Sequence, residues 1–172
     1  MFLIVIILFI VIPIGISYLI YNLIKKRGIN KRYRILSILP ILIFGYFIYE
    51  AIYPDSDFYK NDFKEVTQME FPKSGKIIYK TASFPDNFGD YTSSFLVELD
   101  NDNIVKLQEK LLKNGFKKKE NKMISKELEY IESRTKDKKY VDVYVKDNEN
   151  DKLFSVGFLK DKKSVIITRV SW

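Results

Sequence analysis

The chain has 172 residues, of which 47% are apolar and 15% are aromatic, and its formal net charge is +7. It contains no cysteine, which excludes disulfides, thiolate nucleophiles and zinc sites built on sulfur. It contains no histidine either, so it lacks the commonest metal ligand and the side chain most used for acid–base catalysis near neutral pH.

The positive charge is concentrated in one short stretch. Six of the 29 basic residues lie close together: Lys25, Lys26, Arg27, Lys31, Arg32 and Arg34. Without them, 23 basic residues stand against 22 acidic ones, so the rest of the chain is close to neutral. Binding of nucleic acid depends on a strongly positive surface, and we therefore expect no nucleic-acid partner.

Two apolar stretches near the N-terminus predict transmembrane helices. Residues 2–24 form an uncharged run of about 23 residues, and about 20 are enough to cross the hydrocarbon layer of a bilayer. Residues 35–53 form a second run of about 19, with one charge, Glu50, near its end. Tyrosines gather at both ends of these runs, as they do at membrane–water interfaces. The sequence therefore predicts a transmembrane helical hairpin over residues 1–53, with the lipid bilayer as its partner.

The basic loop between the two runs, residues 25–34, predicts the orientation of the hairpin. Short loops rich in lysine and arginine stay in the cytoplasm, and the residues before the first run carry no charged side chain. We therefore expect the N-terminus and the C-terminal part to lie outside the cytoplasm. A cleaved signal peptide begins with positive charge and ends at a small-residue site, and neither feature is present. A loop of this kind can also attract anionic lipid.

The remaining residues, 54–172, predict one small α+β domain. A short helix follows the second run, and residues 76–84 and 91–99 have the β-branched and aromatic composition of strands. A clear helix then begins at Asp100 or Asn101 and ends at Gly115. Its apolar residues recur at helical spacing: Ile104, Leu107, Leu111 and Leu112.

The last third of the chain predicts a further short helix and three strands. Ile124, Leu128 and Ile131 have helical spacing, and the residues after Tyr140 alternate between apolar and polar side chains. The turns between the alternating segments are short enough for consecutive hairpins. We therefore expect an antiparallel sheet of about five strands with the helices on one face.

No pattern of residues predicts an enzyme, a cofactor or a metal site. Residues 147–151 place carboxylates at alternate positions, but the glycine and the glutamate that a calcium loop needs further on are missing. Asp86 and Asp90 flank a turn, as Asp or Asn does in most turns of this chain. With seven glycines in total, the chain has no glycine-rich phosphate loop.

Aromatic residues on the predicted strands are the candidates for binding a protein partner. Tyr140 and Tyr144 alternate with valines, and Tyr91 begins an earlier strand. Tyrosine supplies a large contact area at low entropic cost, so an exposed row of tyrosines favours protein binding. The alternative interpretation is ordinary cross-strand pairing within the sheet.

Part of the domain resembles a group of known proteins. The stretch 58–99, through its phrases KNDFKEVT, FPKSGKIIYK and GDYTSS, resembles small uncharacterised two-helix membrane proteins of Bacteroidota with an outer α+β domain. The resemblance covers about a quarter of the chain and implies no catalytic residues. It implies a bacterial cytoplasmic (inner) membrane as the location. The plan of a short membrane hairpin with a small outer domain is also similar to that of some bacterial toxin-immunity proteins.

Two hypotheses about function follow, and an enzyme that uses only carboxylates is a third and less favoured one. The first is a membrane-anchored, non-enzymatic module that binds a protein partner outside the cytoplasm, and its most specific form is immunity against a secreted antibacterial toxin. The second is an accessory subunit of a membrane or envelope complex, in which the hairpin itself is the contact surface through Gly15, Ser17 and Gly45.

Overall fold

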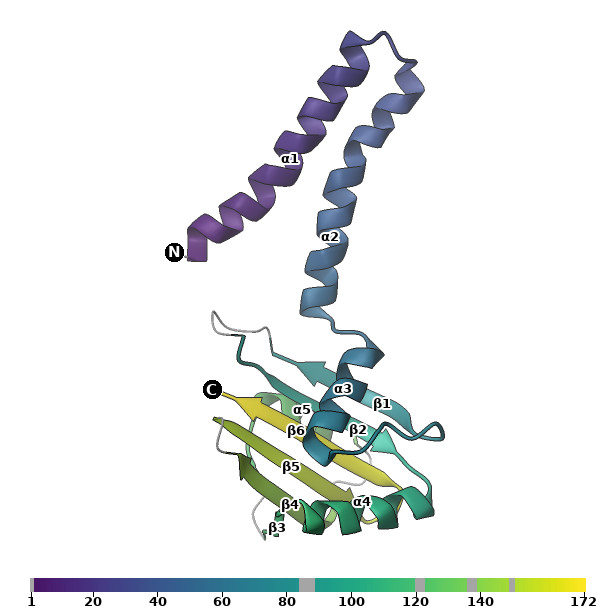
Figure 1. Ribbon diagram of the computed structural model, residues 1–172, viewed down its shortest axis with the longest axis vertical. Coiled ribbons are helices and arrows are strands. Elements are labelled where there is room, and N and C mark those ends of the chain that lie inside the picture. Colours follow the sequence, from purple (N-terminus) through teal and green to yellow (C-terminus); the bar gives the residue numbers. More distant parts are fainter. Residues whose placement is uncertain (1, 84–88, 120–122, 136–138, 149–150) are drawn as a thin grey trace. The chain divides into compact units, whose positions relative to one another are not determined.

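The chain consists of two compact units, Met1–Ile52 and Tyr53–Trp172 (Figure 1). The computed structural model describes residues 2–83, 89–119, 123–135, 139–148 and 151–172, and for residues 2–10, 51 and 148 it describes the backbone alone. Of the features considered above, Asp86 and part of the stretch 147–151 lie outside the described residues.

The first unit is a helical hairpin (Figure 1). Its elements are α1 (Phe2–Lys26), the 3-10 helix η1 (Lys31–Ile38) and α2 (Leu39–Ile52). The chain reverses at Gly28, whose φ of +66° favours glycine because no side chain clashes there. The N–H groups of Gly28 and Ile29 donate hydrogen bonds back to the carbonyls of Lys25 and Ile24, which closes the last turn of α1. α1 packs against both η1 and α2.

The turn of the hairpin is shorter than the predicted loop of residues 25–34. Lys25 and Lys26 still belong to α1, and η1 already begins at Lys31. Asn30 accounts for this early start, because its side chain accepts a hydrogen bond from the N–H of Arg32 and caps η1. The basic residues therefore lie on the two helix ends and the tight turn between them.

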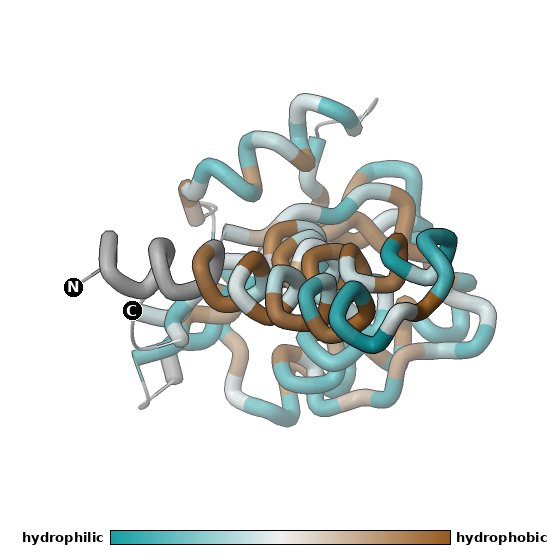
Figure 2. Tube along the Cα trace, turned by 90° about the horizontal axis from the view of Figure 1, so that it is seen from above, coloured by the Kyte–Doolittle hydropathy of each residue, from teal (hydrophilic) through white to brown (hydrophobic). Residues whose placement is uncertain are grey.

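Within the described residues, one helical stretch is long and apolar enough to cross a membrane: Lys31–Glu50, with 20 residues and a mean hydropathy of 1.4. Core helices of soluble proteins reach similar values but are mostly buried, whereas 6% of an 18-residue window of this stretch is buried. Figure 2 shows apolar residues along the hairpin helices and hydrophilic residues near the turn. The other predicted span, residues 2–24, forms the single helix α1. The transmembrane hairpin stays a prediction.

The second unit is built on a six-stranded antiparallel sheet with the strand order β1-β2-β6-β5-β4-β3. The strands are β1 (Lys76–Ala82), β2 (Thr92–Glu98), β3 (Lys117–Lys118), β4 (Tyr140–Asn148), β5 (Lys152–Leu159) and β6 (Ser164–Ser171). The predicted α+β class and antiparallel sheet are confirmed. The additional strand is β3, whose two residues pair with β4 at one edge of the sheet.

Helices cover both faces of the sheet, so the prediction that they lie on one face was wrong (Figure 1). α3 (Ser56–Thr67) and α4 (Asn101–Lys113) pack on one face, and α5 (Lys126–Arg134) packs on the other. The reason is visible in β2, where Phe95, Leu96 and Val97 point alternately to the two faces and all three are buried. A strand that is apolar on both sides needs a cover on both sides.

The larger hydrophobic cluster lies between the sheet and the helices α3 and α4. Phe63, Leu107 and Leu111 are fully buried at its centre, as the helical spacing predicted for the two leucines of α4. The neighbouring Leu112 is 58% exposed, because it lies on the outer side of the helix. The smaller cluster lies under α5 and combines Leu128 and Ile131 of the helix with Leu96, Leu159 and Ile166 of the sheet.

A β-bulge in β4 changes which side its tyrosines face. Tyr140 is opposite Leu159 of β5 and Asp142 is opposite Phe158, so one extra residue, Val141, stands between the paired positions. Tyr140 packs against the cluster under α5, whereas Tyr144 is part of the cluster under α3 and α4. The predicted single tyrosine face along β4 was therefore wrong, since the bulge shifts the alternation by one residue.

Candidate functional site

The structure places the three tyrosines that the sequence singled out in three different environments. Tyr144 is 7% exposed and belongs to the core, which agrees with the alternative of packing within the sheet and not with an exposed row of tyrosines. Tyr140 is partly buried and donates a hydrogen bond of 2.6 Å to Glu132 of α5. Tyr91 is also partly buried, and its hydroxyl donates a 2.7 Å hydrogen bond to Asp62 of α3. No exposed face brings these three side chains together.

Asp62 is the centre of a buried polar cluster that no local pattern in the sequence indicates. Asp62 is 3% exposed, and its carboxylate accepts hydrogen bonds from the hydroxyls of Tyr91 and Ser93. Burial raises the pKa of Asp62, although these two hydrogen bonds and the nearby charge of Arg169 oppose the rise. Burial and the adjacent Asp62 likewise raise the pKa of Tyr91, so this hydroxyl keeps its proton at neutral pH.

An ion-pair group continues the cluster from α3 to β5 and β6. Glu65 accepts hydrogen bonds from Nζ of Lys152 at 2.6 Å and from Nε of Arg169 at 2.9 Å. Burial alone would raise the pKa of Glu65, but the hydrogen bonds and charges of Lys152 and Arg169 outweigh it and hold that pKa below its usual value. The guanidinium of Arg169, itself 5% exposed, also lies 4.0 Å above the ring of Tyr91 and donates to Ser171.

This cluster holds α3 against the sheet. The hydrogen bonds of Asp62 and Glu65 satisfy the groups of Arg169 and Ser93 that would otherwise be buried without partners. The chain has no histidine or cysteine to act beside these carboxylates, and the hydroxyls next to Asp62, those of Tyr91 and Ser93, donate their hydrogen bonds to it. Among the described residues, no group of three or more side chains of metal-ligating type is placed to hold an ion. The hydrogen bonds and the ion pairs of this cluster connect α3 to strands β2, β5 and β6.

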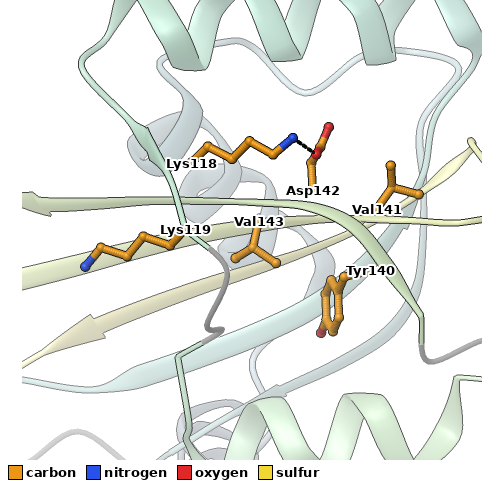
Figure 3. A pocket seen from close by; sticks show the side chains of 6 residues that line it. All are labelled: Lys118, Lys119, Tyr140, Val141, Asp142 and Val143. Atoms are coloured by element: carbon orange, nitrogen blue, oxygen red, sulfur yellow. Dashed lines mark ion pairs between the residues drawn. The ribbon is translucent and has the colours of Figure 1, made fainter.

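A surface pocket of about 420 Å³ lies at the edge of the sheet where β3 ends (Figure 3). Figure 3 shows Lys118 and Asp142 on one side of β4 and Lys119, Val143 and Tyr140 on the other. Val141 also lines the pocket and is 58% exposed, because the bulge pushes it outward. The pocket therefore joins an apolar side chain, an aromatic ring and two lysines at one edge.

The pocket has a net positive lining. Lys118 forms an ion pair with Asp142, and the hydrogen bond to that carboxylate raises the pKa of Lys118. Lys119 has no ion pair with any described residue. The backbone N–H of Lys119 donates to the carbonyl of Val143 at 2.9 Å, which extends the pairing of β3 with β4 by one residue. In the part of the chain that the structure describes, no strand pairs with the outer side of Val141 and Asp142.

The six basic residues gather at the turn end of the hairpin, as the sequence predicted. None of them forms an ion pair with a described residue. Five are exposed, whereas Arg34 is half-buried, with its guanidinium 5.8 Å from the centre of the Tyr21 ring. The Nε of Arg34 has no hydrogen-bond partner in the described structure.

Comparisons of the chain with protein-family models, with curated proteins and with solved structures found no match. The resemblance to two-helix membrane proteins of Bacteroidota stays a prediction.

The sequence contained one sign of the buried cluster. Arg169 interrupts the apolar run of the last strand. When both faces of a strand are buried, a charged side chain in it needs a partner of opposite charge. Its partner, Glu65, lies 104 positions earlier in the chain, on a helix that looks merely amphipathic in sequence. The spacing of residues in the sequence therefore could not predict the contact between Arg169 and Glu65.

Proposed function

We propose that this chain is a membrane-anchored, non-enzymatic module that displays a small α+β domain for binding a protein partner. The observation that supports the anchor most strongly is the stretch Lys31–Glu50, which is apolar, long enough to cross a bilayer and almost wholly unburied within the chain. Leu42 and Phe47, for example, are 62% and 60% exposed. Apolar surface on this scale needs a cover, and a bilayer supplies it.

The proposed location is the bacterial cytoplasmic membrane, with both the N-terminus and the domain on the outer side. The support is the charge asymmetry: six cations gather at the turn of the hairpin, and the helix α2 ends in Ile52 without a basic residue in its last turn. Lysine and arginine at a short connection keep it in the cytoplasm.

The proposed binding surface is the pocket at the β4 edge. An extended segment of a partner protein can add to a sheet by pairing its backbone with an edge strand, which provides affinity, while side-chain pockets provide specificity. Val141 offers exposed apolar area beside the aromatic ring of Tyr140, and Lys119 offers a charge for a carboxylate of the partner. Of the tyrosines that the sequence proposed, Tyr140 alone lines this surface.

The most specific form of the proposal is immunity against a secreted antibacterial toxin, with the toxin as the partner. The second candidate is an accessory subunit of a membrane complex. It is favoured by Gly15 and Gly45, where an added Cβ would meet no atom within 4 Å, so a neighbouring helix could approach closely at both positions. Ser17, which we expected on the same contact surface, is 8% exposed inside the hairpin and is not available.

The anchor is tested with reporters fused after Trp172 in bacterial cells. A reporter that works only outside the cytoplasm should be active, and one that works only in the cytoplasm should be inactive. Replacing the six basic residues with glutamine and serine should mix the two orientations. Full activity of the cytoplasmic reporter in the unaltered chain would reverse the proposed orientation.

The binding surface is tested by placing a photo-crosslinking amino acid at Val141 and, as a matched control, at Val105. The two valines are similarly exposed, at 58% and 53%, but Val105 lies on α4, away from the pocket. We expect one discrete protein adduct from position 141, absent from position 105 and lost when Lys119→Glu is added. Equal adducts from both positions would place the contact elsewhere, and an adduct with a toxin would identify the immunity form.

A further inference from the structure

The turn end of the hairpin carries positive charge that no described residue balances with an ion pair. Among residues 1–52, Glu50 is the only acidic side chain, and it lies at the far end of α2 from the turn, where it accepts a hydrogen bond from Tyr46. The six basic residues have no ion pair with a described residue. An anion from outside the chain is therefore the natural counterpart of this cluster.

Arg34 is distinct from the other five cations because it is partly fixed in place. Its guanidinium lies 5.8 Å from the centre of the Tyr21 ring, so η1 and α1 are joined by a cation–π contact. The hydroxyl of Ser37 donates to the carbonyl of Arg34 at 2.6 Å, which stabilises the backbone on that side. A guanidinium held in one place loses less entropy when it binds a phosphate in its planar, two-pronged geometry.

One donor of this guanidinium lacks an acceptor. Nε of Arg34 is withdrawn from solvent and has no hydrogen-bond partner in the described structure. A charged N–H group without an acceptor is costly, so the guanidinium is short of acceptors. Nε itself is enclosed, and a phosphate beside Arg34 would accept from the other N–H groups of the guanidinium. Lys31 and Arg32 lie within the preceding turn of the same helix, so further cations can contact the same phosphate or its neighbours.

Aromatic side chains place the cluster at the depth of lipid headgroups. Tyr21 is 36% exposed and Tyr33 is 57% exposed, and tyrosines prefer the boundary between hydrocarbon and headgroups. Tyr21 precedes Lys25 by one helical turn, about 6 Å along the axis. If the apolar helices lie in the bilayer, the basic cluster is at the level of the phosphates.

We infer that the turn of the hairpin binds the phosphate groups of anionic phospholipids, with Arg34 as the fixed ligand and the surrounding cations as its support. This inference rests on the proposed membrane anchor and adds the chemical class of lipid that the anchor selects. It also gives η1 a role, since this 3-10 helix brings Arg34 over Tyr21.

The test uses the purified full-length chain in detergent, with bound lipid counted by native mass spectrometry. Short-chain phosphatidylglycerol is compared with phosphatidylcholine of the same chain length and with inorganic phosphate. We expect retention of phosphatidylglycerol and at least about tenfold less of the other two, a ratio that corresponds to 1.4 kcal/mol. Equal retention of phosphatidylcholine would overturn the selectivity, and displacement of phosphatidylglycerol by an equal concentration of inorganic phosphate would make this a site for free phosphate.

The role of Arg34 is tested with Arg34→Gln, and the control is Arg134→Gln. Arg134 also stacks on a tyrosine, with its Cζ 4.8 Å from the Tyr130 ring, but it lies on α5 in the other unit. Arg34→Gln should abolish the preference for phosphatidylglycerol, and Arg134→Gln should preserve it. An unchanged preference in Arg34→Gln would refute the assignment. The double variant Lys31→Gln and Arg32→Gln should weaken retention of phosphatidylglycerol while the contact between Arg34 and Tyr21 stays intact. It therefore tests the lipid site even if Arg34→Gln fails to fold.

Flotation with vesicles separates this inference from the anchor on which it depends. A chain that floats with pure phosphatidylcholine vesicles but shows no preference for phosphatidylglycerol refutes the lipid site and leaves the anchor intact. A chain that floats with neither vesicle refutes both.

Discussion

The two units of this protein use apolar residues in opposite ways. In the domain, Phe63, Leu107 and Leu111 are fully enclosed by other side chains, and the buried charge of Arg169 is paired with the partly exposed Glu65. In the hairpin, apolar side chains of α1 and α2 remain exposed along the helices. The domain encloses its own core, whereas the hairpin, as the proposed membrane anchor, would have its apolar surface covered by the bilayer. Composition averaged over the whole chain hides this difference.

The largest expected effect comes from separating the two units. Residues 53–172 produced alone should stay soluble without detergent and unfold in one cooperative transition, because their core closes within the fragment. The full-length chain should need detergent or lipid, because the hairpin cannot bury its apolar surface. Size-exclusion chromatography and circular dichroism of both proteins check this. A fragment that aggregates or shows no cooperative transition would mean that the domain depends on the hairpin.

Two neighbouring leucines of α4 test the core of the domain. Leu111→Ala should lower the free energy of unfolding of the fragment by about 2–5 kcal/mol, because it leaves a cavity under the helix. Leu112→Ala should change it by less than about 0.5 kcal/mol, because that side chain is on the surface. Urea denaturation measures both values. Similar losses in the two variants would show that the helix packs with another face.

Much of the domain was predictable from local patterns. The helix over residues 101–113 was clear from its apolar spacing, and Gly115 ends it with a φ of +80°. The strands of the last third were clear from their alternation. The packing of α5 on the second face of the sheet was not predictable, because the sequence of a short helix with two buried residues does not show which face it packs on. The bulge at Val141 was also hidden, since it depends on the pairing of β4 with β5.

The candidate surfaces were less predictable than the fold. The basic cluster of the hairpin was found from composition alone, because charge density needs no tertiary contact to be seen. The pocket at the β4 edge depends on where β3 stops, and two residues of strand leave no periodic pattern. The cluster of Asp62 and Arg169 depends on segments that are distant in sequence. Local patterns therefore indicated the basic cluster of the hairpin and missed the contacts that shape the domain.

A smaller effect is expected where Tyr140 covers Gly157 of β5. A Cβ added to Gly157 would lie well inside van der Waals distance of the Tyr140 ring. Gly157→Ala should therefore destabilise the fragment by about 1–3 kcal/mol. Combining it with Tyr140→Ala should cost less than the sum of the two single changes, because the clash is removed. A fully additive double-mutant cycle would show that the ring moves away freely, and Tyr140 would then be available to a partner without loss of stability.

The smallest expected effect is the response of the domain to pH, and it distinguishes the two carboxylates of α3. The pKa of Glu65 is lower in the folded state than the unfolded value of about 4.3. Its stabilising contribution is therefore present above that pH and is lost as the pH falls through the folded pKa. The pKa of Asp62 is raised by burial, so its ionised form costs stability at neutral pH and this cost disappears on acidification.

Urea midpoints of the fragment between pH 7 and pH 3 separate these opposite contributions. The advantage of the unaltered domain over Glu65→Gln should shrink with acidification, by about 1 kcal/mol or less because the Glu65 side chain is 35% exposed. The stability of the unaltered domain relative to Asp62→Asn should instead increase over the same pH range, because protonated Asp62 no longer carries a buried charge. If both differences moved in the same direction, Asp62 would be ionised and stabilised in the folded state. Arg169 would then have to neutralise both carboxylates, which would make the buried cluster a single charge network centred on the guanidinium.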